Sequence, residues 1–363
     1  MRGKTEFKGR LFFAHAGDVV YSKIDVRNGA IGIVPDSMPL VAFSSEYPIY
    51  SVDSVEAASD YVKLLFRTNA FQSRINGLVS GASGRKRVEP VTLEKLAVPL
   101  PSKPEQEAII AGWSLAQAVV AKAQRLIDKP KQRLNEWLFS ITNAEPFERR
   151  SLELRWEDLA SWDVKSSRAA AFRLANPTFK PLSTYAEEAT ELVKPRLEPE
   201  KDWPVYGVNN KEGVFFSHHQ KGAEFNAAYK RIRKGWFFHN PTRSSVGSLG
   251  IVPEVPADAI TSPEYQVWRV RAGLLPGFVA VLVATEYFIK LIQFHRVGAV
   301  KQRLYVENLL AMPIPKVPEK LQREIAEERA AALTALGKAR ADARQAATEV
   351  EALILGTKKL RAS

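Results

Sequence analysis

The feature that most constrains this chain is a heptad pattern of apolar residues in residues 104–141. Apolar side chains recur there at alternating steps of four and three, from Ile109 to Ile141, over more than four heptads. Such a seam predicts a long helix that packs against a partner helix. Pro130 occupies one seam position, and we expect it to kink the helix or to loosen its last third.

A second seam begins at Ile325, at an offset of 216 from the first, so the chain itself offers a partner for the first helix. Eight of the ten equivalent positions are apolar. Both helices keep their other faces polar, which suits a helix pair better than burial on all sides. The alternative is that each amphipathic helix only covers a domain. The candidate seam residues are Ile109, Trp113, Val120, Ile127, Leu134, Trp137, Ile325, Leu336, Val350 and Leu353.

The two helices belong to a larger internal duplication. With an offset of 218, Gly29–Pro35 (GAIGIVP) aligns with Gly247–Pro253 (GSLGIVP). The offset drifts to 214 for Val98–Pro101 and Met312–Pro315, which indicates short insertions or deletions in loops. So many matches in the same order argue against chance, and they predict two copies of one structural unit.

Each copy is expected to contain a strand-rich section, a helix, a basic loop and then the long helix. We expect strands in 19–24, 30–35 and 48–52, and again in 235–240, 248–253 and 265–270. The helices before the basic loops are expected over Ala57–Asn76 and Pro276–His295. The predicted class is α+β, with two mixed α/β domains and two long helices that pair as an antiparallel coiled coil. The expected boundaries are 1–102 and 146–317 for the domains, and 103–145 and 318–363 for the helices.

The two copies are unequal in length before their first matching glycine. The second copy begins near Leu152 and runs a long way before Gly235, whereas Gly17 lies close to Met1. At an offset of 218, the segment 152–217 has no counterpart in the first copy. We therefore expect the first domain to be N-terminally incomplete by the equivalent of that segment.

Composition narrows the classes of function. The chain has 52 Lys and Arg against 40 Asp and Glu, and this balance favours a polyanionic partner. Cysteine is absent, which excludes a disulfide framework, a Cys-based zinc site and a thiol nucleophile. No apolar run long enough to cross a bilayer occurs and no signal peptide is evident, so we expect a cytoplasmic protein without a membrane partner. His218 and His219 lack a further ligand at suitable spacing, and no metal site is expected.

Two kinds of polar segment are candidates for DNA contact. One is the basic loop at Gly81–Arg87 (GASGRKR) and its equivalent at 298–303; the other is the Arg-bearing segment before each GIVP strand, at 22–28 and 240–245. Such segments can approach phosphates, and Arg can also read guanine edges. The alternative is solvated loops and hairpin connections without a ligand. The candidate DNA-binding residues are Lys23, Arg27, Asn28, Ser83, Arg85, Lys86, Arg87, Arg243, Ser244, Ser245, Lys301, Gln302 and Arg303.

The sequence carries no catalytic constellation. Asn176–Phe179 (NPTF) is superficially similar to the Asn-Pro-Pro-Phe motif of DNA amino-methyltransferases, but no Gly-rich strand–loop–helix accompanies it to hold S-adenosylmethionine. No Walker loop and no Ser/His/Asp set are evident. We therefore expect a binding protein and not an enzyme.

The order of these features resembles the specificity (S) subunits of type I restriction–modification enzymes, over essentially the whole chain. The segments that carry the resemblance are Gly17–Ile24, Asn28–Pro35, Gly81–Val88 and Leu96–Pro101 in the first copy, and Tyr206–Asn210, Gly247–Pro253 and Met312–Pro315 in the second.

The resemblance implies two target recognition domains that each read half of a bipartite site in double-stranded DNA, with the long helices as an antiparallel spacer. DNA methyltransferase (M) subunits would dock on this scaffold, and a motor–nuclease restriction (R) subunit could join them in defence against foreign DNA. S-adenosylmethionine, Mg and ATP would belong to those partners, so the S chain itself would hold no cofactor. Two alternatives stay open: a self-contained DNA methyltransferase or nuclease, and a coiled-coil scaffold that does not bind DNA.

Overall fold

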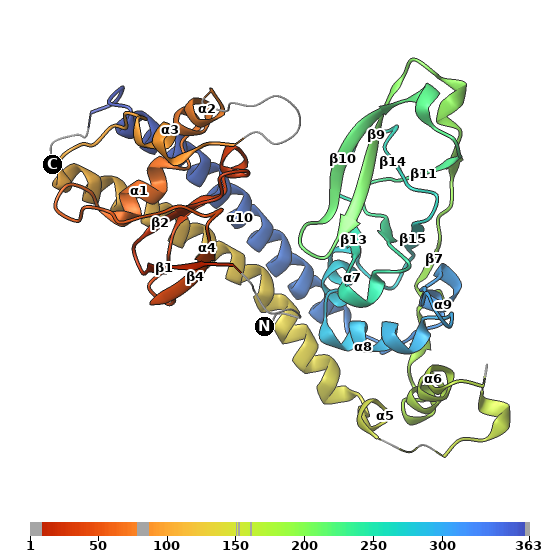
Figure 1. Ribbon diagram of the computed structural model, residues 1–363. Coiled ribbons are helices and arrows are strands. Elements are labelled where there is room, and N and C mark those ends of the chain that lie inside the picture. The colour runs from red at the N-terminus through yellow and green to blue at the C-terminus, as the bar shows by residue number, and fades with distance from the viewer. Residues whose placement is uncertain (1–8, 78–86, 150, 152, 160–161, 360–363) are drawn as a thin grey trace. The chain divides into compact units, whose positions relative to one another are not determined.

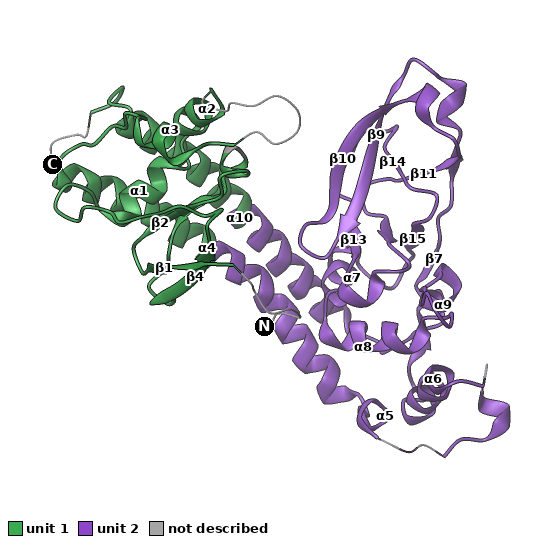
Figure 2. Cartoon of the chain, viewed as in Figure 1, with its two compact units in different colours: residues 1–122, 336–363 green, residues 123–335 purple. Residues whose placement is uncertain are grey.

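The computed structural model describes residues 9–77, 87–149, 151, 153–159 and 162–359. The chain forms two compact units, shown in Figure 2: unit 1 contains residues 1–122 and 336–363, and unit 2 contains residues 123–335. The division falls inside both long helices, α4 (Lys103–Ile141) and α10 (Glu319–Ile354), so each unit holds part of each helix. Helix α4 continues through Pro130 as a single helix.

Unit 1 contains two small antiparallel sheets (Figure 1). One pairs β1 (Leu11–His15) with β4 (Leu40–Ser44), and the other has the order β3-β2-β5. The strands of the second sheet are β2 (Val19–Tyr21), β3 (Ile31–Ile33) and β5 (Ile49–Tyr50). The short helices are η1 (Val26–Asn28), α1 (Ser59–Leu65), α2 (Asn69–Gly77) and α3 (Pro90–Glu94).

Unit 2 contains two larger sheets, with the orders β13-β12-β15-β7 and β10-β9-β14-β11-β8, and the two-stranded pair β16-β6. All pairs are antiparallel except β14 with β9. The strands are β6 (Lys180–Pro181), β7 (Ala186–Glu188), β8 (Leu192–Val193), β9 (Asp202–Asn209), β10 (Gly213–Lys221), β11 (Tyr229–Arg231), β12 (Phe237–His239), β13 (Leu249–Ile251), β14 (Ile260–Thr261), β15 (Gln266–Val270) and β16 (Pro313–Ile314). The helices are α5 (Glu145–Glu148), η2 (Trp156–Asp158), α6 (Val164–Ala175), η3 (Leu182–Thr184), η4 (Pro195–Leu197), η5 (Gly222–Glu224), η6 (Ser244–Val246), α7 (Pro276–Leu282), α8 (Glu286–His295) and α9 (Val306–Leu310).

The predicted mixture of strands and helices is confirmed, but the helix before each basic loop is two helices and not one. In unit 1 the break between α1 and α2 lies at Thr68, and in unit 2 the break between α7 and α8 lies at Thr285. Each Thr hydroxyl accepts a hydrogen bond from the backbone N–H three residues later, at 3.2 Å in both cases. The side-chain oxygen thus takes the place of a backbone acceptor and starts a new helix.

Among the described residues, no single helix is long and apolar enough to cross a membrane. Helices α7 and α8 reach the necessary length and composition only together, as a pair bent by 76°. Their side chains Phe278, Val279, Tyr287 and Phe288 lie in the main core of unit 2.

The internal duplication extends to individual hydrogen bonds. Gly29 and Gly247, which align at an offset of 218, end η1 and η6 with φ angles of 84° and 85°. Each donates its N–H to the first carbonyl of its turn at 3.0 Å. Positive φ favours glycine, which explains why both turns end with this residue.

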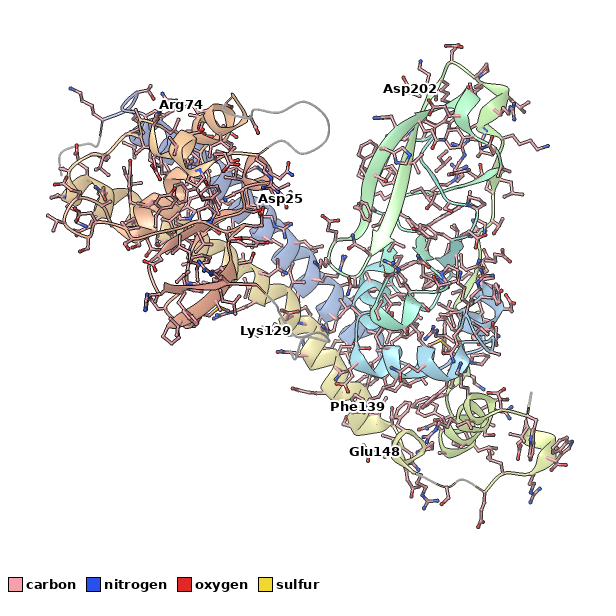
Figure 3. The ribbon with its side chains drawn as sticks, viewed as in Figure 1. Asp25, Arg74, Lys129, Phe139, Glu148 and Asp202 are labelled. Atoms are coloured by element: carbon pink, nitrogen blue, oxygen red, sulfur yellow. The ribbon has the colours of Figure 1, made fainter. Side chains whose placement is uncertain are left out.

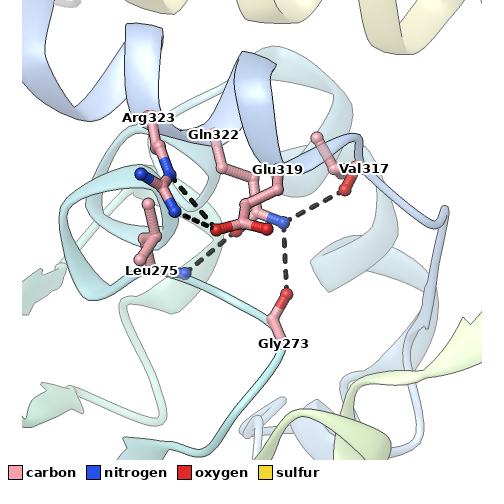
Figure 4. A network of polar contacts seen from close by, with 6 residues as sticks. All are labelled: Gly273, Leu275, Val317, Glu319, Gln322 and Arg323. Atoms are coloured by element: carbon pink, nitrogen blue, oxygen red, sulfur yellow. Dashed lines mark hydrogen bonds and ion pairs between the residues drawn. The ribbon is translucent and has the colours of Figure 1, made fainter.

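A buried glutamine fixes the start of each long helix against its own domain. In unit 2, Gln322 Oε1 accepts a hydrogen bond from Leu275 N at 3.0 Å, and Nε2 donates to the carbonyls of Gly273 at 3.1 Å and Val317 at 3.0 Å (Figure 4). In unit 1, Gln106 makes the equivalent three bonds. Both side chains are almost fully buried, and all three polar bonds of each amide are made with backbone groups.

Each unit also needs the long helix of the other repeat. Leu134 and Leu138 of α4 are fully buried in the core of unit 2. Their equivalents in α10 at an offset of 216, Val350 and Ile354, are buried in the core of unit 1. A cap accompanies each contact. Asn135 Oδ1 accepts a hydrogen bond of 3.0 Å from the backbone N–H of the second residue of α8. The carboxylate of Glu351 accepts a hydrogen bond of 3.0 Å from the backbone N–H of the second residue of α2.

We expect Gln106→Ala and Gln322→Ala to destabilise different units. Each substitution removes three hydrogen bonds to partly or fully buried backbone groups, so the cost should be about 1–3 kcal/mol. Chemical denaturation measures that loss. Hydrogen exchange locates it, with faster exchange at Ala58 in the first variant and at Leu275 in the second.

The matched control is Gln117→Ala, because Gln117 is exposed on α4. Its effect should stay within about 0.5 kcal/mol. Equal stability of Gln322→Ala and Gln117→Ala would contradict the role assigned to the buried amides.

Candidate nucleic-acid interface

The candidate site in unit 2 begins with the turn at 240–248, between β12 and β13. Asn240 Oδ1 accepts hydrogen bonds from the N–H of Thr242 at 3.0 Å and from its hydroxyl at 2.8 Å. Asn240 N donates to Ser248 O at 3.0 Å, which closes the turn. These bonds hold Arg243 at an exposed position on a well-defined turn.

The second part of the site is the loop at 296–303, which follows α8. Val297 and Arg303 pair across the loop through two backbone hydrogen bonds of 2.8 Å. Gly298 has a φ of 102°, and a Cβ at this position would lie 2.6 Å from Lys301 O. Only glycine therefore fits, and the closed loop leaves Lys301 exposed.

Arg296 joins these two segments. Its Nη1 donates to Ser245 Oγ at 2.9 Å, and its Nη2 donates to Gln302 O at 3.0 Å. Leu304 N also donates to Pro241 O at 3.0 Å. Two segments that are far apart in the sequence thus form one surface.

Sequence reasoning missed Arg296 and its neighbour Lys165. The only local signal for Arg296 is its position between the predicted helix end and the basic loop. Lys165, on α6, donates from Nζ to Arg296 O at 3.3 Å, and nothing near Lys165 in the sequence indicates that contact.

The cations of this surface lack the carboxylate partners found elsewhere in the unit. Arg231 and Arg233 pair with Glu191, and Arg269 and Arg271 pair with Glu187. Within the described part of the chain, none of the ion pairs includes any of the four Arg and Lys residues of the two segments. Those four residues are Arg243, Arg296, Lys301 and Arg303.

The partial burial of these cations makes a bound anion more favourable. The Nε atoms of Arg296 and Arg303 are buried and have no hydrogen-bond partner among the described residues. Burial lowers the pKa of the Arg296 guanidinium. The pKa of the Lys165 ammonium is lowered mainly by burial and further by the charge of Arg296. The charges of Glu264 and Asp163 act on Arg303 and Lys165, but no ion pair with a carboxylate is formed by these cations among the described residues. Such a group of cations favours the approach of a phosphate group.

Unit 1 brings together the equivalent segments. Val88 N donates to Lys23 O at 2.9 Å, which matches the bond from Leu304 to Pro241. Asp25, labelled in Figure 3, precedes η1, and its N–H donates to Ser22 Oγ at 3.2 Å. Arg87 forms an ion pair with Glu46 at 3.4 Å, so here one cation is partly neutralised.

The predicted DNA-binding residues differ in accessibility. Asn28, Arg243 and Lys301 are exposed, whereas Lys23, Arg87, Ser245, Gln302 and Arg303 are half-buried. Ser244 is fully buried, and its hydroxyl donates to Pro241 O at 3.3 Å, so it stabilises the turn and does not face solvent. Ser83, Arg85, Lys86 and the side chain of Arg27 lie outside the described residues.

The candidate seam residues all lie at least half-buried. Ile109, Leu134, Ile325, Leu336 and Val350 are buried. Trp113, Val120, Ile127, Trp137 and Leu353 are half-buried. Arg133 of α4 forms ion pairs with Glu324 and Glu328 of α10, which places the end of α4 beside the start of α10 in unit 2.

The Asn176–Phe179 segment, considered as a methyltransferase motif, has a structural role. Asn176 is 5% exposed. Its Oδ1 accepts from Asn143 N at 2.9 Å, and its Nδ2 donates to the carbonyls of Asn143 and Phe172. The amide is thus occupied in closing the end of α6. Among the described residues, no group of three His, Asp or Glu side chains is placed to hold a metal ion.

A buried histidine stabilises the backbone of the candidate interface. His239 Nε2 donates to Leu304 O at 2.9 Å, while its buried Nδ1 has no partner within the described part of the chain. Burial, with a smaller effect of the Lys230 charge, lowers the pKa of His239 to about 4. In unit 1 the equivalent bond runs from Tyr21 Oη to Val88 O at 3.2 Å.

We expect unit 2 to lose stability in mild acid through His239. In the unfolded chain this side chain takes up a proton near its ordinary pKa of 6.5, whereas the folded state resists until about pH 4. The stability present above pH 6.5 should therefore fall progressively between pH 6.5 and 4, by up to about 3 kcal/mol.

His239→Gln keeps an N–H donor and removes this titration. Denaturation curves across this pH range should show that the free energy of unfolding of the variant rises relative to that of the wild type as the pH falls. A constant difference between the two proteins from pH 7 to about pH 4 would contradict the assignment.

Comparison with known proteins found solved structures that are similar to this chain. No protein-family model matches the chain, and no curated protein matches it. Three solved structures are similar to it over most of their length. The S subunit of a type I restriction–modification system from M. genitalium is 13% identical, with 96% of this chain and 84% of that chain covered and a TM-score of 0.46. The HsdS subunit from Thermoanaerobacter tengcongensis is 14% identical, with coverages of 94% and 80% and a TM-score of 0.29. A chain from a structural study of assembly and conformational transition in the type I restriction–modification system is 14% identical, with coverages of 94% and 81% and a TM-score of 0.39.

Proposed function

We propose that this chain is a DNA-reading specificity subunit of a type I restriction–modification complex. One observation carries the proposal: each repeat joins a polar turn to the segment that follows its basic loop, through equivalent hydrogen bonds at Lys23–Val88 and Pro241–Leu304. Two copies of one interface suit a ligand that is itself repetitive and negatively charged. Double-stranded DNA has both properties.

The unit 2 surface provides two kinds of contact to DNA. Arg243 and Lys301 are exposed and can neutralise phosphates, releasing counterions. Arg296 holds the turn at 240–248 and the loop at 296–303 together. A side chain that reads bases from the turn or the loop is therefore attached to a backbone of fixed position. Direct readout needs such preorganisation because a bidentate contact tolerates little error in position.

The two domains would each read one half of a bipartite site. The long helices would act as the spacer, and the apolar positions shared between each domain and both helices support this role. Linking two modest readers in one chain raises the overall affinity without new contacts. We propose DNA methyltransferase subunits as the partners that supply S-adenosylmethionine, with a restriction subunit supplying ATP- and Mg-dependent activity. The chain itself is proposed to be non-catalytic and to act in the cytoplasm.

A self-contained methyltransferase is the competing function, and Asn176 argues against it. Its amide is committed to three hydrogen bonds at the end of α6 and is nearly inaccessible. Calorimetric titration of the isolated chain with S-adenosylmethionine separates the two functions. Saturable binding would favour the enzyme, and no heat of binding is expected here.

We expect the double variant Arg243→Ala/Lys301→Ala to weaken binding to any duplex and to reduce its salt dependence. If each side chain contacts one phosphate, the slope of log K against log salt concentration should become shallower by about 2. Fluorescence anisotropy with labelled duplexes at several salt concentrations measures both effects.

The control is Lys234→Ala with Arg233→Ala, which removes the same formal charge but from side chains paired with Glu254 and Glu191. This control should leave the salt slope nearly unchanged. If both double variants behave like the wild type, the surface does not bind DNA and the non-DNA-binding scaffold becomes the better account.

A further inference from the structure

The antiparallel pair of β1 and β4 in unit 1 exposes an apolar face. Leu11 is 47%, Phe13 59% and Leu40 54% exposed. The register pairs Phe13 with Ala42 and Leu11 with Ser44, so these side chains point to the same side of the strand pair. Three large exposed apolar residues on one small face mark a surface that can bind a further protein segment.

The second repeat contains an equivalent antiparallel strand pair in the same register. Phe12 faces Phe43 and Phe13 faces Ala42 in unit 1. In unit 2, at the offset of 218 that relates the repeats, Lys230 faces Thr261 and Arg231 faces Ile260. Strands β1 and β4 are therefore the equivalents of β11 and β14.

In unit 2, a further strand covers the equivalent strand pair. Strand β9 runs parallel to β14, with Val205 beside Ile260 and Tyr206 beside Thr261. Trp203, Val205 and Phe225 then bury Ile260 completely.

Among the described residues, neither outer edge of the β1–β4 pair has an equivalent neighbouring strand. Strand β8 pairs with the other side of β11 in unit 2. Among the described residues of unit 1, β1 and β4 pair only with each other. The backbone N–H and carbonyl of His15, at the end of β1, are already bonded to Asp18, and Ser44 O, at the end of β4, accepts from Tyr47 N. The rest of the β4 edge is the part that offers backbone donors and acceptors to a further strand.

We propose that the edge of β4 binds an extended polypeptide strand with the chemistry of β9, running parallel to β4 and carrying bulky apolar side chains at alternate positions. The chemistry is argued from β9, where Trp203 and Val205 are two residues apart and face the same side. Backbone hydrogen bonds to the edge provide affinity, and the face of Leu11, Phe13 and Leu40 selects the apolar side chains. This inference does not depend on DNA binding.

The test uses the full chain and a synthetic peptide of residues 200–221, which contains β9 and β10. Saturable binding is expected, with hydrogen exchange at residues 40–44 slowed by about tenfold or more and little change elsewhere. Phe13→Lys and Leu40→Lys should abolish the protection. Because both side chains are exposed, neither variant should unfold the unit, and circular dichroism checks this.

Val91→Lys is the matched control, since Val91 is an exposed apolar residue elsewhere in the same unit, 61% accessible on α3. It should bind the peptide like the wild type. No binding, or binding that Phe13→Lys and Leu40→Lys leave unchanged, overturns the proposal. Protection of residues 40–44 that rises with protein concentration alone would overturn it too, because a second copy would then occupy the edge.

Discussion

The architecture depends on the burial of long-helix residues in cores that the other repeat builds. Leu134 and Leu138 belong to the helix that follows the first domain, yet they are fully buried among side chains of the second. Val350 and Ile354 make the reciprocal contribution to unit 1. A fully buried Leu or Ile contributes on the order of 1.5–3 kcal/mol, so each unit gains substantially from these contacts. Neither domain has a complete core without both helices.

That constraint also positions the candidate interface. The buried glutamines fix each helix start, and the caps from Asn135 and Glu351 fix the helix before each basic loop. In unit 2 the loop then leaves α8 at Arg296, which reaches back to the turn at 240–248. The packing of the core thus determines where the unpaired cations lie. The chemistry of the surface follows from them, because Arg and Lys without carboxylate partners attract phosphate.

Much of this arrangement could be read from the sequence because it depends on periodicity and repetition. The heptad seam predicts α4 and α10, and alternating apolar runs between glycines predict β2, β3, β12, β13 and β15. The breaks at Thr68 and Thr285 were missed because apolar spacing continues across them, and only a side-chain hydrogen bond ends one helix and starts the next. The interface was less predictable. Sequence reasoning found the turn and the loop but not Arg296, whose bond to Ser245 joins distant segments. It also included Ser244, which is buried under the turn, because tertiary packing decides burial and local composition does not encode it.

The central claim is that two equivalent interfaces in one chain read DNA together. The most direct test is to sequence the duplexes that the full chain, assembled with the methyltransferase subunits proposed as its partners, enriches from a randomised pool. The account predicts two short conserved blocks separated by a gap of fixed length and free sequence, with Arg296→Ala weakening only one block. A single contiguous block, or no enrichment at all, would contradict it.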